Sequence, residues 1–482
     1  DTQGRYDINA MEFDALVRDA DPEIPGDQPY VIEFSAGNAG PGRQTIGTPA
    51  VGKNVIAVGA SQNNRRSFPV YADGMESMAD LSSRGPCEDG RVKPDLVAPG
   101  TWVASLRSAA AGDQNAWLPI SADYIYLGGT SQSAASVAGA RAVFVQYYRQ
   151  THGNATPSPA LVKAALINSA TDMNDQAGTA PVPNNDEGWG RLDLSGIIGT
   201  RRALDFMDQS ALLATGQAYE QRVIVAGSSE PLKITLAYTD VPGLPAAIPA
   251  LVNDLDLEVV APDGRVYRGN GFDNGESIPG AQDSDSINNV EGVHVRRPVP
   301  GEYLVRVRAA RVTEDARVDT ARVDQDFALV VSGDLSLKGA GVLIFNQTAY
   351  TAPGLVQLKL IDFDLAGRSS VSVRLNSTTE TNGETVLLRP LSSLGVFTGS
   401  VATTTGSVLE DGQLQIKHGD QITALYQDAS PPDGRSASAW ADMQPPELIK
   451  VSSTNRFGKT IVSWETREPA NSIVRYGTNR NL

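Results

Sequence analysis

Apolar residues in the first two hundred positions follow two different periodicities. Residues 13–20 carry apolar side chains at helical spacing, whereas residues 30–34 and 55–58 form short, mostly apolar runs. Runs of that kind, interleaved with helices, are typical of parallel strands that are buried on both faces. The pattern therefore predicts an α/β fold with a parallel sheet for this part of the chain.

Two further helices are expected toward the end of this part. Residues 131–149 are rich in Ala, Ser and Gly, and so many small side chains favour close packing of a helix on all sides. The positions expected to be buried in this helix are Ala134, Val137, Ala138, Val143 and Phe144. Ser158 followed by Pro159 is a helix start signal, which predicts another helix through Leu166.

Beyond residue 204 the pattern changes to strands separated by turn residues. The runs 232–236 and 303–307 are strand-like, and Pro, Gly, Asn and Asp lie between such runs. A second β region covers 338–428, and a linker is expected to begin at Pro431. A third β segment follows, with a strand at 460–464.

The sequence thus predicts four parts, which are residues 1–204, 205–337, 338–440 and 445–482. They are expected to be an α/β part, an all-β domain, an Ig-like β-sandwich and a fibronectin type III-like segment. The last is too short to close a sandwich, and the chain opens on Asp1 rather than on Met. We therefore expect both ends of the sequence to lie within domains.

Composition removes several classes of function. The chain of 482 residues has 40 basic and 56 acidic residues, for a net charge of −16, and no basic cluster interrupts this acidic surface. It should therefore repel nucleic acid and anionic membranes. No apolar run reaches the roughly 18 residues that a membrane span needs. The single cysteine, Cys87, excludes an internal disulfide framework.

The first candidate for chemistry is Gly129-Thr130-Ser131, at the start of the small-residue helix. A serine there exposes its hydroxyl and directs its backbone N–H toward developing negative charge. Alone, the tripeptide is weak evidence, because it is common and serine is a frequent N-cap.

The second candidate is Asn38, within the glycine-rich loop 35–41 that follows a buried strand. An amide there is placed to donate a hydrogen bond to an oxyanion, although asparagine also serves simply to satisfy turns. Further short motifs follow in order along the chain, at 48–50, 55–61, 82–86, 93–100 and 188–191.

Taken together, these motifs resemble those of the subtilase family of serine peptidases, over all of residues 1–200. The similarity is greatest to secreted alkaline bacterial subtilases that carry a C-terminal jelly-roll β-barrel, and residues 251–257 and 288–291 support that choice. The resemblance implies a subtilisin-like catalytic domain lacking its N-terminal part, followed by a jelly-roll domain. It also implies an extracellular protein that acts on protein or peptide substrates.

The resemblance also implies roles for particular residues. Ser131 is the expected nucleophile, and Asn38 and the Ser131 N–H are the expected oxyanion donors. The residues expected to contact substrate are Gly37, Gly47, Thr48, Pro49, Ala50, Gly129 and Thr130. The match of Thr48-Pro49 to a wall of the pocket for the residue before the scissile bond predicts a cis peptide there.

The chain departs from the family pattern in its histidines. Subtilases order their triad Asp, His, Ser along the chain. Here His152, His294 and His418 all follow Ser131. His152 lies beyond a helix too long to reach back, and the other two are expected on the surfaces of β domains. The general base and its aspartate are therefore expected on an upstream segment, a potential partner of this chain, and residues 1–482 alone are expected to be inactive.

Smaller departures surround the nucleophile. Gln132 stands where the family commonly has Met, and Ala135-Ser136 stand where it has Pro-His. None of these positions moves a proton in the mechanism. Replacement of Met by Gln predicts resistance to peroxide, because Gln has no oxidisable sulfur.

Two other functions remain open at this point. In one, the chain is an inactive pseudoprotease that serves as a binding or structural module. In the other, its β domains bind glycans or cell surfaces. Retention of both Ser131 and Asn38 argues for the peptidase, and the β domains show no obvious aromatic platform.

One cofactor is expected, which is a structural Ca²⁺ ion in the all-β domain. Oxygen-bearing side chains cluster there, and calcium requires six to eight hard oxygen ligands. The predicted ligands are Asp254, Asp256, Asp285 and Asn288, with Asn253 and Asp283 nearby. Acidic loops are also commonly just solvated surface, and that alternative stays open.

Overall fold

A computed structural model describes residues 3–467, except 66, 69, 71, 73, 111–115, 174–179, 200–201, 318–319, 337–340, 366, 393–394, 430–431, 446 and 457–458. The chain divides into two compact units, Asp1–Leu337 and Lys338–Leu482. This division coincides with the boundary expected between the all-β domain and the β-sandwich. The remaining proposed boundaries stay predictions.

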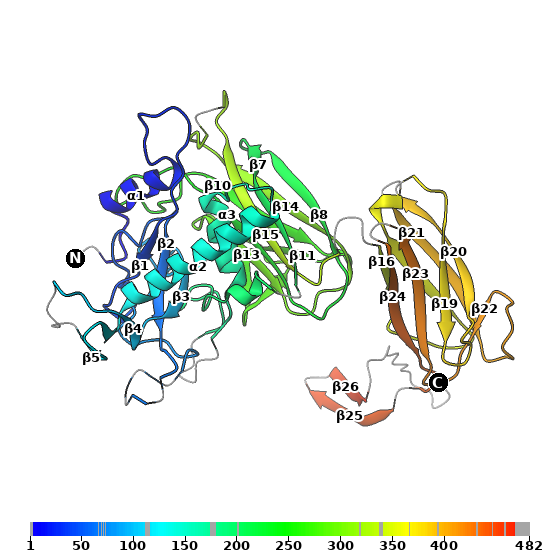
Figure 1. The fold of residues 1–482 in the computed structure, drawn as a ribbon. Coiled ribbons are helices and arrows are strands. Elements are labelled where there is room, and N and C mark those ends of the chain that lie inside the picture. The colour runs from blue at the N-terminus through cyan, green and yellow to red at the C-terminus, as the bar shows by residue number, and fades with distance from the viewer. Residues whose placement is uncertain are drawn as a thin grey trace. The chain divides into compact units, whose positions relative to one another are not determined.

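The first unit begins with the expected parallel sheet. Helix α1 (Ile8–Arg18) precedes strands β1 (Glu33–Ser35), β2 (Ile56–Ser61) and β3 (Leu96–Pro99). The strands lie in the order β1-β2-β3 and all run parallel. Every residue of β2 is buried, as its apolar run predicts. Helix α2 (Thr130–Thr151) packs against all three strands (Figure 1).

The burial expected for α2 is only partly correct. Val137 and Phe144 are buried and Ala134 and Ala138 are half-buried, but Val143 is 47% exposed. A Cβ added to Gly139 would meet no other heavy atom within 4 Å. The reason is that the sheet covers one face of α2, and no other layer covers the opposite face in the described part of the chain. No helix among the described residues is both long and apolar enough to cross a membrane.

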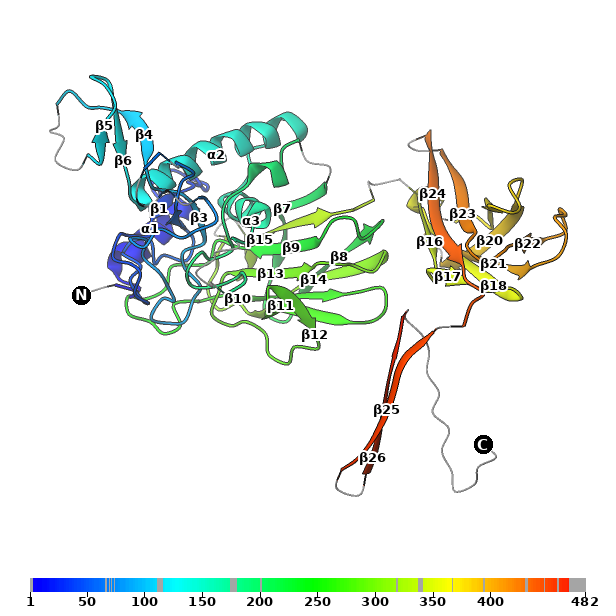
Figure 2. The ribbon, with the colours of Figure 1, turned by 90° about the horizontal axis from the view of Figure 1, so that it is seen from below.

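Helix α3 (Pro159–Ser169) begins as predicted, with the Ser158 hydroxyl accepting a hydrogen bond from the Leu161 N–H. It continues past Leu166, and all of its residues are buried. The cause is that α3 packs on α2 and on the 3₁₀ turn η1 (Leu194–Gly196). It also packs on three strands of the following β domain, β7 (Ala203–Leu213), β9 (Leu232–Ala237) and β15 (Gln325–Gly333) (Figure 2).

The all-β part of the first unit consists of two antiparallel sheets. One has the strand order β12-β11-β10-β14-β8 and the other β13-β9-β15-β7. Apolar side chains of both sheets form one core. This arrangement agrees with the predicted all-β domain, whereas its assignment as a jelly roll stays a prediction. The strands are β7 (Ala203–Leu213), β8 (Ala218–Val225), β9 (Leu232–Ala237), β10 (Asp254–Val260), β11 (Val266–Asp273), β12 (Glu276–Pro279), β13 (Val290–Val295), β14 (Gly301–Arg311) and β15 (Gln325–Gly333).

A small antiparallel sheet lies between β3 and α2 in the sequence. Its strands are β4 (Val103–Leu106), β5 (Leu118–Pro119) and β6 (Tyr124–Leu127), in the spatial order β4-β6-β5. Strand β6 leads directly into the loop that precedes Ser131.

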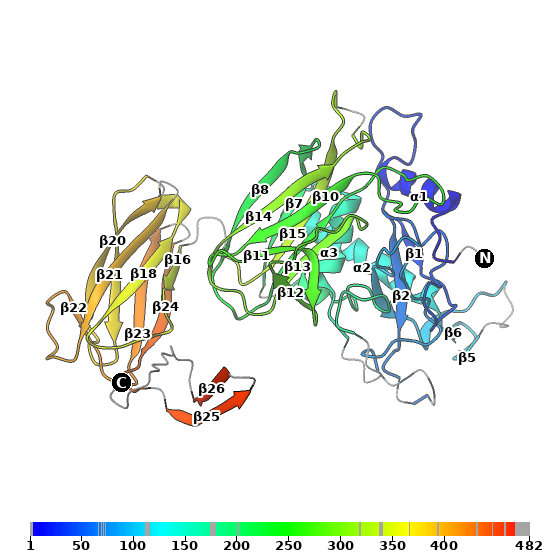
Figure 3. The same cartoon turned by 180° about the vertical axis from the view of Figure 1, so that it is seen from behind.

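The second unit is a β-sheet structure with its own apolar core (Figure 3). Strand β24 pairs along its length with β23, so the linker expected from Pro431 is wrong. The hairpin of β25 and β26 contains the predicted strand at 460–464, and residues 468–482 of the expected fibronectin-like segment lie outside the described residues. The strands are β16 (Val342–Phe345), β17 (Ala349–Tyr350), β18 (Gly354–Ile361), β19 (Val371–Ser377), β20 (Glu384–Ser392), β21 (Val396–Thr404), β22 (Gln413–Gln415), β23 (Gln421–Ala429), β24 (Pro432–Ala441), β25 (Leu448–Arg456) and β26 (Lys459–Thr466), with the 3₁₀ turn η2 (Phe363–Leu365) after β18.

Candidate active site

Ser131 is an exposed residue in the first turn of α2. The start of this helix is held at the carboxyl end of β3 by two hydrogen bonds. The Gly129 N–H donates to the Gly100 carbonyl at 2.7 Å, and the Ser133 hydroxyl donates to the Ala98 carbonyl at 2.8 Å. The hydroxyl of Ser131 therefore lies where the helix N–H groups and dipole favour negative charge.

Asn38 is held by Thr130, 92 residues further along the chain. Its Oδ1 accepts hydrogen bonds from the Thr130 N–H at 2.9 Å and from the Thr130 hydroxyl at 3.0 Å. The Gly37 N–H donates to the same hydroxyl at 3.2 Å. Because both bonds to Asn38 end on Oδ1, its Nδ2 remains available as a donor, and no described residue accepts from it. Thr130, expected to contact substrate, thus orients the predicted oxyanion donor.

Two glycines, one in the Asn38 loop and one directly before α2, leave little room for a larger residue. Gly37 has φ +110°, and a Cβ there would lie 2.7 Å from the Ser83 hydroxyl oxygen. Gly129 has φ +147°, and a Cβ there would lie 3.3 Å from Asn38 Nδ2 and 3.2 Å from Gln132 Oε1. The side-chain amides of Gln132 and Asn38 therefore both lie next to the position that a Cβ of residue 129 would occupy.

The structure confirms the cis peptide expected in residues 47–50 and places this segment near Asn38. The Gly47 N–H donates to the Ala36 carbonyl at 2.8 Å, which places this segment beside the Asn38 loop. The Thr48–Pro49 peptide is cis, as predicted, and other X–Pro bonds of the chain are cis as well. The Thr48 hydroxyl donates to Asp7, the N-cap of α1, at 2.5 Å. Contact of 47–50 with substrate stays a prediction.

The three histidines lie in separate places. His152 is the C-cap of the 22-residue α2, about 30 Å along the helix from Ser131. His294 is buried between Trp189 and Phe272, so its expected surface position is wrong. Burial holds the pKa of His294 well below its usual value. His418 belongs to the second unit, where its Nδ1 lies 3.3 Å from Asp442.

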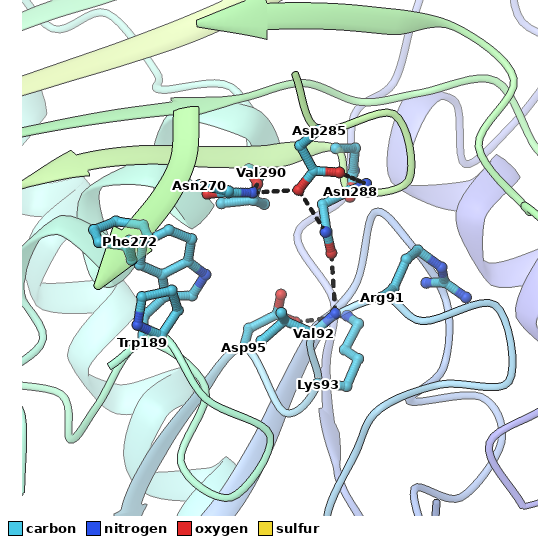
Figure 4. A pocket seen from close by; sticks show the side chains of 12 residues that line it. Arg91, Val92, Lys93, Asp95, Trp189, Asn270, Phe272, Asp285, Asn288 and Val290 are labelled. Atoms are coloured by element: carbon cyan, nitrogen blue, oxygen red, sulfur yellow. Dashed lines mark hydrogen bonds and ion pairs between the residues drawn. The ribbon is translucent and has the colours of Figure 1, made fainter. Parts of the chain in front are cut away.

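Two of the predicted calcium ligands lie in the loop between β12 and β13, which is hydrogen-bonded to the parallel-sheet part. Asp285 accepts from Asn270 Nδ2 at 2.5 Å, from Asn288 Nδ2 at 2.7 Å and from two backbone N–H groups. The side-chain oxygen of Asn288 accepts from the Val92 N–H at 3.0 Å. These residues line a cavity of about 290 Å³, with aromatic side chains on its other side (Figure 4).

The other two predicted ligands lie on β10. Burial and the nearby Asp256 carboxylate raise the pKa of Asp254 to about 6. One oxygen of Asp254 and one of Glu291 are buried without a hydrogen-bond partner. Asp256 pairs with Arg308 at 3.3 Å. No three acidic, histidine or cysteine side chains among the described residues form a metal-binding group. Asp254 fits a cation better than Asp285 does, because it has an oxygen without a partner, whereas Asp285 already accepts from Asn270 and Asn288. Calcium binding stays a prediction.

The sequence interpretation missed an aromatic cluster next to the nucleophile. Phe68 stacks on Trp102, with ring centroids 3.9 Å apart, and Trp117 and Tyr126 meet Trp102 edge to face. A Cβ at Gly128 would lie 2.0 Å from the Trp117 ring. Two tryptophans within sixteen residues of each other, just before Ser131, were the available signal.

Comparison with known proteins gives concordant matches. The model of the subtilase family, Peptidase_S8, matches residues 3–190. The "Serine protease/ABC transporter B family protein tagA" of Dictyostelium discoideum is 31% identical over 293 residues, covering 55% of this chain and 16% of the relative. "Serine protease AprX" of Bacillus subtilis is 33% identical over 153 residues, covering 30% and 31% of the two chains. The chain therefore spans less than a third of the length of these relatives.

Among solved structures, the "Patellamide maturation protease PatA" is 24% identical, with a TM-score of 0.24, and covers 34% of this chain and 47% of that one.

Proposed function

We propose that the protein is a serine endopeptidase in which Ser131 attacks the scissile carbonyl of protein substrates, because the model of the subtilase family matches residues 3–190. The observation that carries this proposal is the arrangement of Asn38, Thr130 and Ser131. Thr130 fixes Oδ1 of Asn38, so that Nδ2 is the side of the amide free to donate beside an exposed serine at a helix N-terminus.

The proposed reaction is acyl transfer. The Ser131 oxygen forms a bond to the carbonyl carbon, and its proton passes to a general base. The same base returns that proton to the leaving amine as the peptide C–N bond breaks. Water then attacks the acyl-enzyme in the same manner and releases the second product. Asn38 Nδ2 and the Ser131 N–H stabilise the oxyanion in both steps, and a side-chain donor of this kind contributes about 3–4 kcal/mol.

We propose that the general base and its carboxylate come from a segment outside residues 1–482. His152 and His294 are not placed to contact Ser131, since one ends α2 and the other is enclosed by aromatic rings. The exposed face of α2 supports the proposal, because Val143 is 47% exposed and Gly139 has no neighbour within 4 Å of an added Cβ. A face of such small side chains permits close approach of another element.

The test supplies the base from solution. Residues 1–482 are incubated with an acyl-peptide p-nitrophenyl ester, with and without imidazole, and the acyl adduct is located by peptide mass spectrometry. We expect imidazole to increase acylation of Ser131, and Asn38→Ala to reduce it. Ser136, an exposed serine about one and a half turns further along α2, is the matched control and should stay unmodified. Equal labelling of Ser131 and Ser136 would contradict the proposal.

A second experiment addresses turnover. Residues 1–482 alone should not hydrolyse casein, whereas the full-length gene product should, and Ser131→Ala should abolish that activity. Absence of activity in both forms would favour the inactive binding or structural module.

We also propose that the protein acts outside the cell. Fractionation of cultures, with detection by an antibody against residues 1–482, tests this proposal.

A further inference from the structure

One face of the small sheet before α2 is apolar and exposed. Leu106 pairs directly with Tyr124, and Tyr126 pairs with both Ala104 and Leu118. Directly paired residues of antiparallel strands lie on the same face of a sheet, so these five residues form one surface, named the hairpin face. Leu106 is 73% exposed, Tyr124 50% and Leu118 46%. None of the five carries a charge, although the chain has a net charge of −16.

The base of the hairpin face is a fixed aromatic platform. The Tyr126 and Phe68 rings meet edge to face, with centroids 5.0 Å apart, and Phe68 stacks on Trp102. The indole N–H of Trp102 donates to the Val70 carbonyl at 2.6 Å. Rings held in this way lose little freedom on binding a ligand, which lowers the entropic cost of binding.

The strand that carries Tyr124 and Tyr126 of the hairpin face leads directly to the loop before the proposed nucleophile. Trp117 lies against Gly128, where a Cβ would be 2.0 Å from its ring. Gly128 is three residues before Ser131, so their Cα atoms are at most about 11 Å apart. Figure 2 shows β4, β5 and β6 extending outward from the start of α2. An extended chain bound at Ser131 therefore has an apolar surface within a few residues of its reacting bond.

We propose that the hairpin face binds an apolar, extended segment of the polypeptide substrate, and that Leu106, Leu118 and Tyr124 determine specificity for such segments. The inference rests on the proposed peptidase function, because continuity with Ser131 identifies the occupant as substrate. Unfolded polypeptides expose apolar side chains that folded proteins bury. The hairpin face thus selects unfolded or flexible apolar segments over polar ones.

The test measures binding without chemistry. Residues 1–482 carrying Ser131→Ala are titrated into fluorescein-labelled, reduced and carboxymethylated α-lactalbumin, and fluorescence anisotropy is followed. The double variant Leu106→Ser/Tyr124→Ser should bind about tenfold more weakly, because it removes two large apolar contacts. The matched control is Leu355→Ser/Leu387→Ser, two residues of the second unit that are each 50% exposed. It should bind like the parent.

The outcomes separate this inference from the peptidase proposal. Equal affinity of the hairpin variant and the control overturns the inference, even if imidazole restores acylation of Ser131. Selective weakening supports binding of apolar polypeptide by the hairpin face, whereas acylation of Ser131 tests the peptidase proposal separately. Light scattering is run on each variant. The parent protein could instead be a dimer that fails to bind the labelled polypeptide, with only the hairpin variant monomeric. That result would show that the hairpin face is a contact between two copies of the chain, and it would also overturn the inference.

Discussion

At the scale of single residues, Gln132 lies beside the amide proposed to stabilise the oxyanion. Its Oε1 and Asn38 Nδ2 lie 3.2 and 3.3 Å from the same point over Gly129. A methionine sulfoxide there would place a bulkier, polar group at this point. We expect the active enzyme to keep most of its activity in peroxide and Gln132→Met to lose it, with residual activity and the mass of the 132 peptide as measurements.

Equal inactivation of the two proteins would show that residue 132 does not control oxidation. Another methionine would then be the site to examine, because Cys87 is fully buried and burial raises the pKa of its thiol.

Glu187 predicts a pH dependence of stability. Its side chain is fully buried, and burial raises its pKa from 4.5 to about 7. Between pH 4.5 and about pH 7, the Glu187 carboxyl is therefore protonated in the folded state but ionised in the unfolded state. Its contribution to stability is complete below about pH 4.5 and is lost as pH rises toward 7. We expect urea denaturation of Glu187→Gln to show a shallower loss of stability from pH 5 to 8 than the parent.

The direction of the Asn38 amide marks the limit of sequence reasoning at this scale. The glycine-rich loop after a buried strand is enough to identify Asn38 as a candidate. Which end of its amide is free depends on Thr130, and no local pattern relates residues 92 positions apart. The same holds for Trp117, whose contact with Gly128 depends on the register of β5 and β6.

At the scale of elements, Ser158 has two bonding partners. Its hydroxyl accepts from the Leu161 N–H at 3.0 Å as the N-cap of α3, and it donates to Asp208 on β7. Ser158→Ala should lower the free energy of unfolding by about 1–2 kcal/mol, measured by urea denaturation. Ser158→Thr is the control and should keep most of the stability. An unchanged value for Ser158→Ala would show that α3 does not depend on its cap.

Strand β10 provides the test of calcium binding. Asp254 has a buried oxygen without a partner, and a cation would neutralise it together with the nearby Asp256. If calcium binds there, EGTA lowers the melting temperature of the parent, and Asp254→Asn removes this effect. Identical melting curves with calcium and with EGTA would contradict calcium binding. Asp433, exposed in the second unit, is the control position for Asp→Asn.

Helix α2 shows that a sequence predicts where a helix begins and ends better than it predicts which face of the helix is buried. Its expected bounds are nearly correct, because Gly129 and the run of small residues mark them. Its expected burial is not, because a small-residue helix has no polar face to indicate which side meets solvent. Val143, expected to be buried, is therefore 47% exposed. The start of α3 is correct because Ser158 and Pro159 act locally.

At the scale of the whole molecule, the parallel-sheet part and the β domain share buried polar contacts. Lys53 Nζ lies 2.5 Å from Asp240, and both side chains are fully buried. Lys53 also donates to the carbonyls of Val241 and Ala250. Arg18 pairs with Asp326 of the β domain at 2.7 Å. The change of sequence pattern near residue 204 suggests separate domains, but these long-range pairs make one unit of residues 1–337.

This coupling predicts the number of thermal transitions. Calorimetry of residues 1–482 should show two, one for each unit. Lys53→Met leaves Asp240 buried without its partner, which costs about 3–5 kcal/mol and lowers the first unit's transition by roughly 5 °C. The second transition should not move. Arg435→Met, which removes a pair with the buried Asp428 of the second unit, is the converse control and should shift only that unit. If Lys53→Met instead splits the first transition in two, the parallel-sheet part and the β domain unfold separately, and the buried pair joins two independent domains.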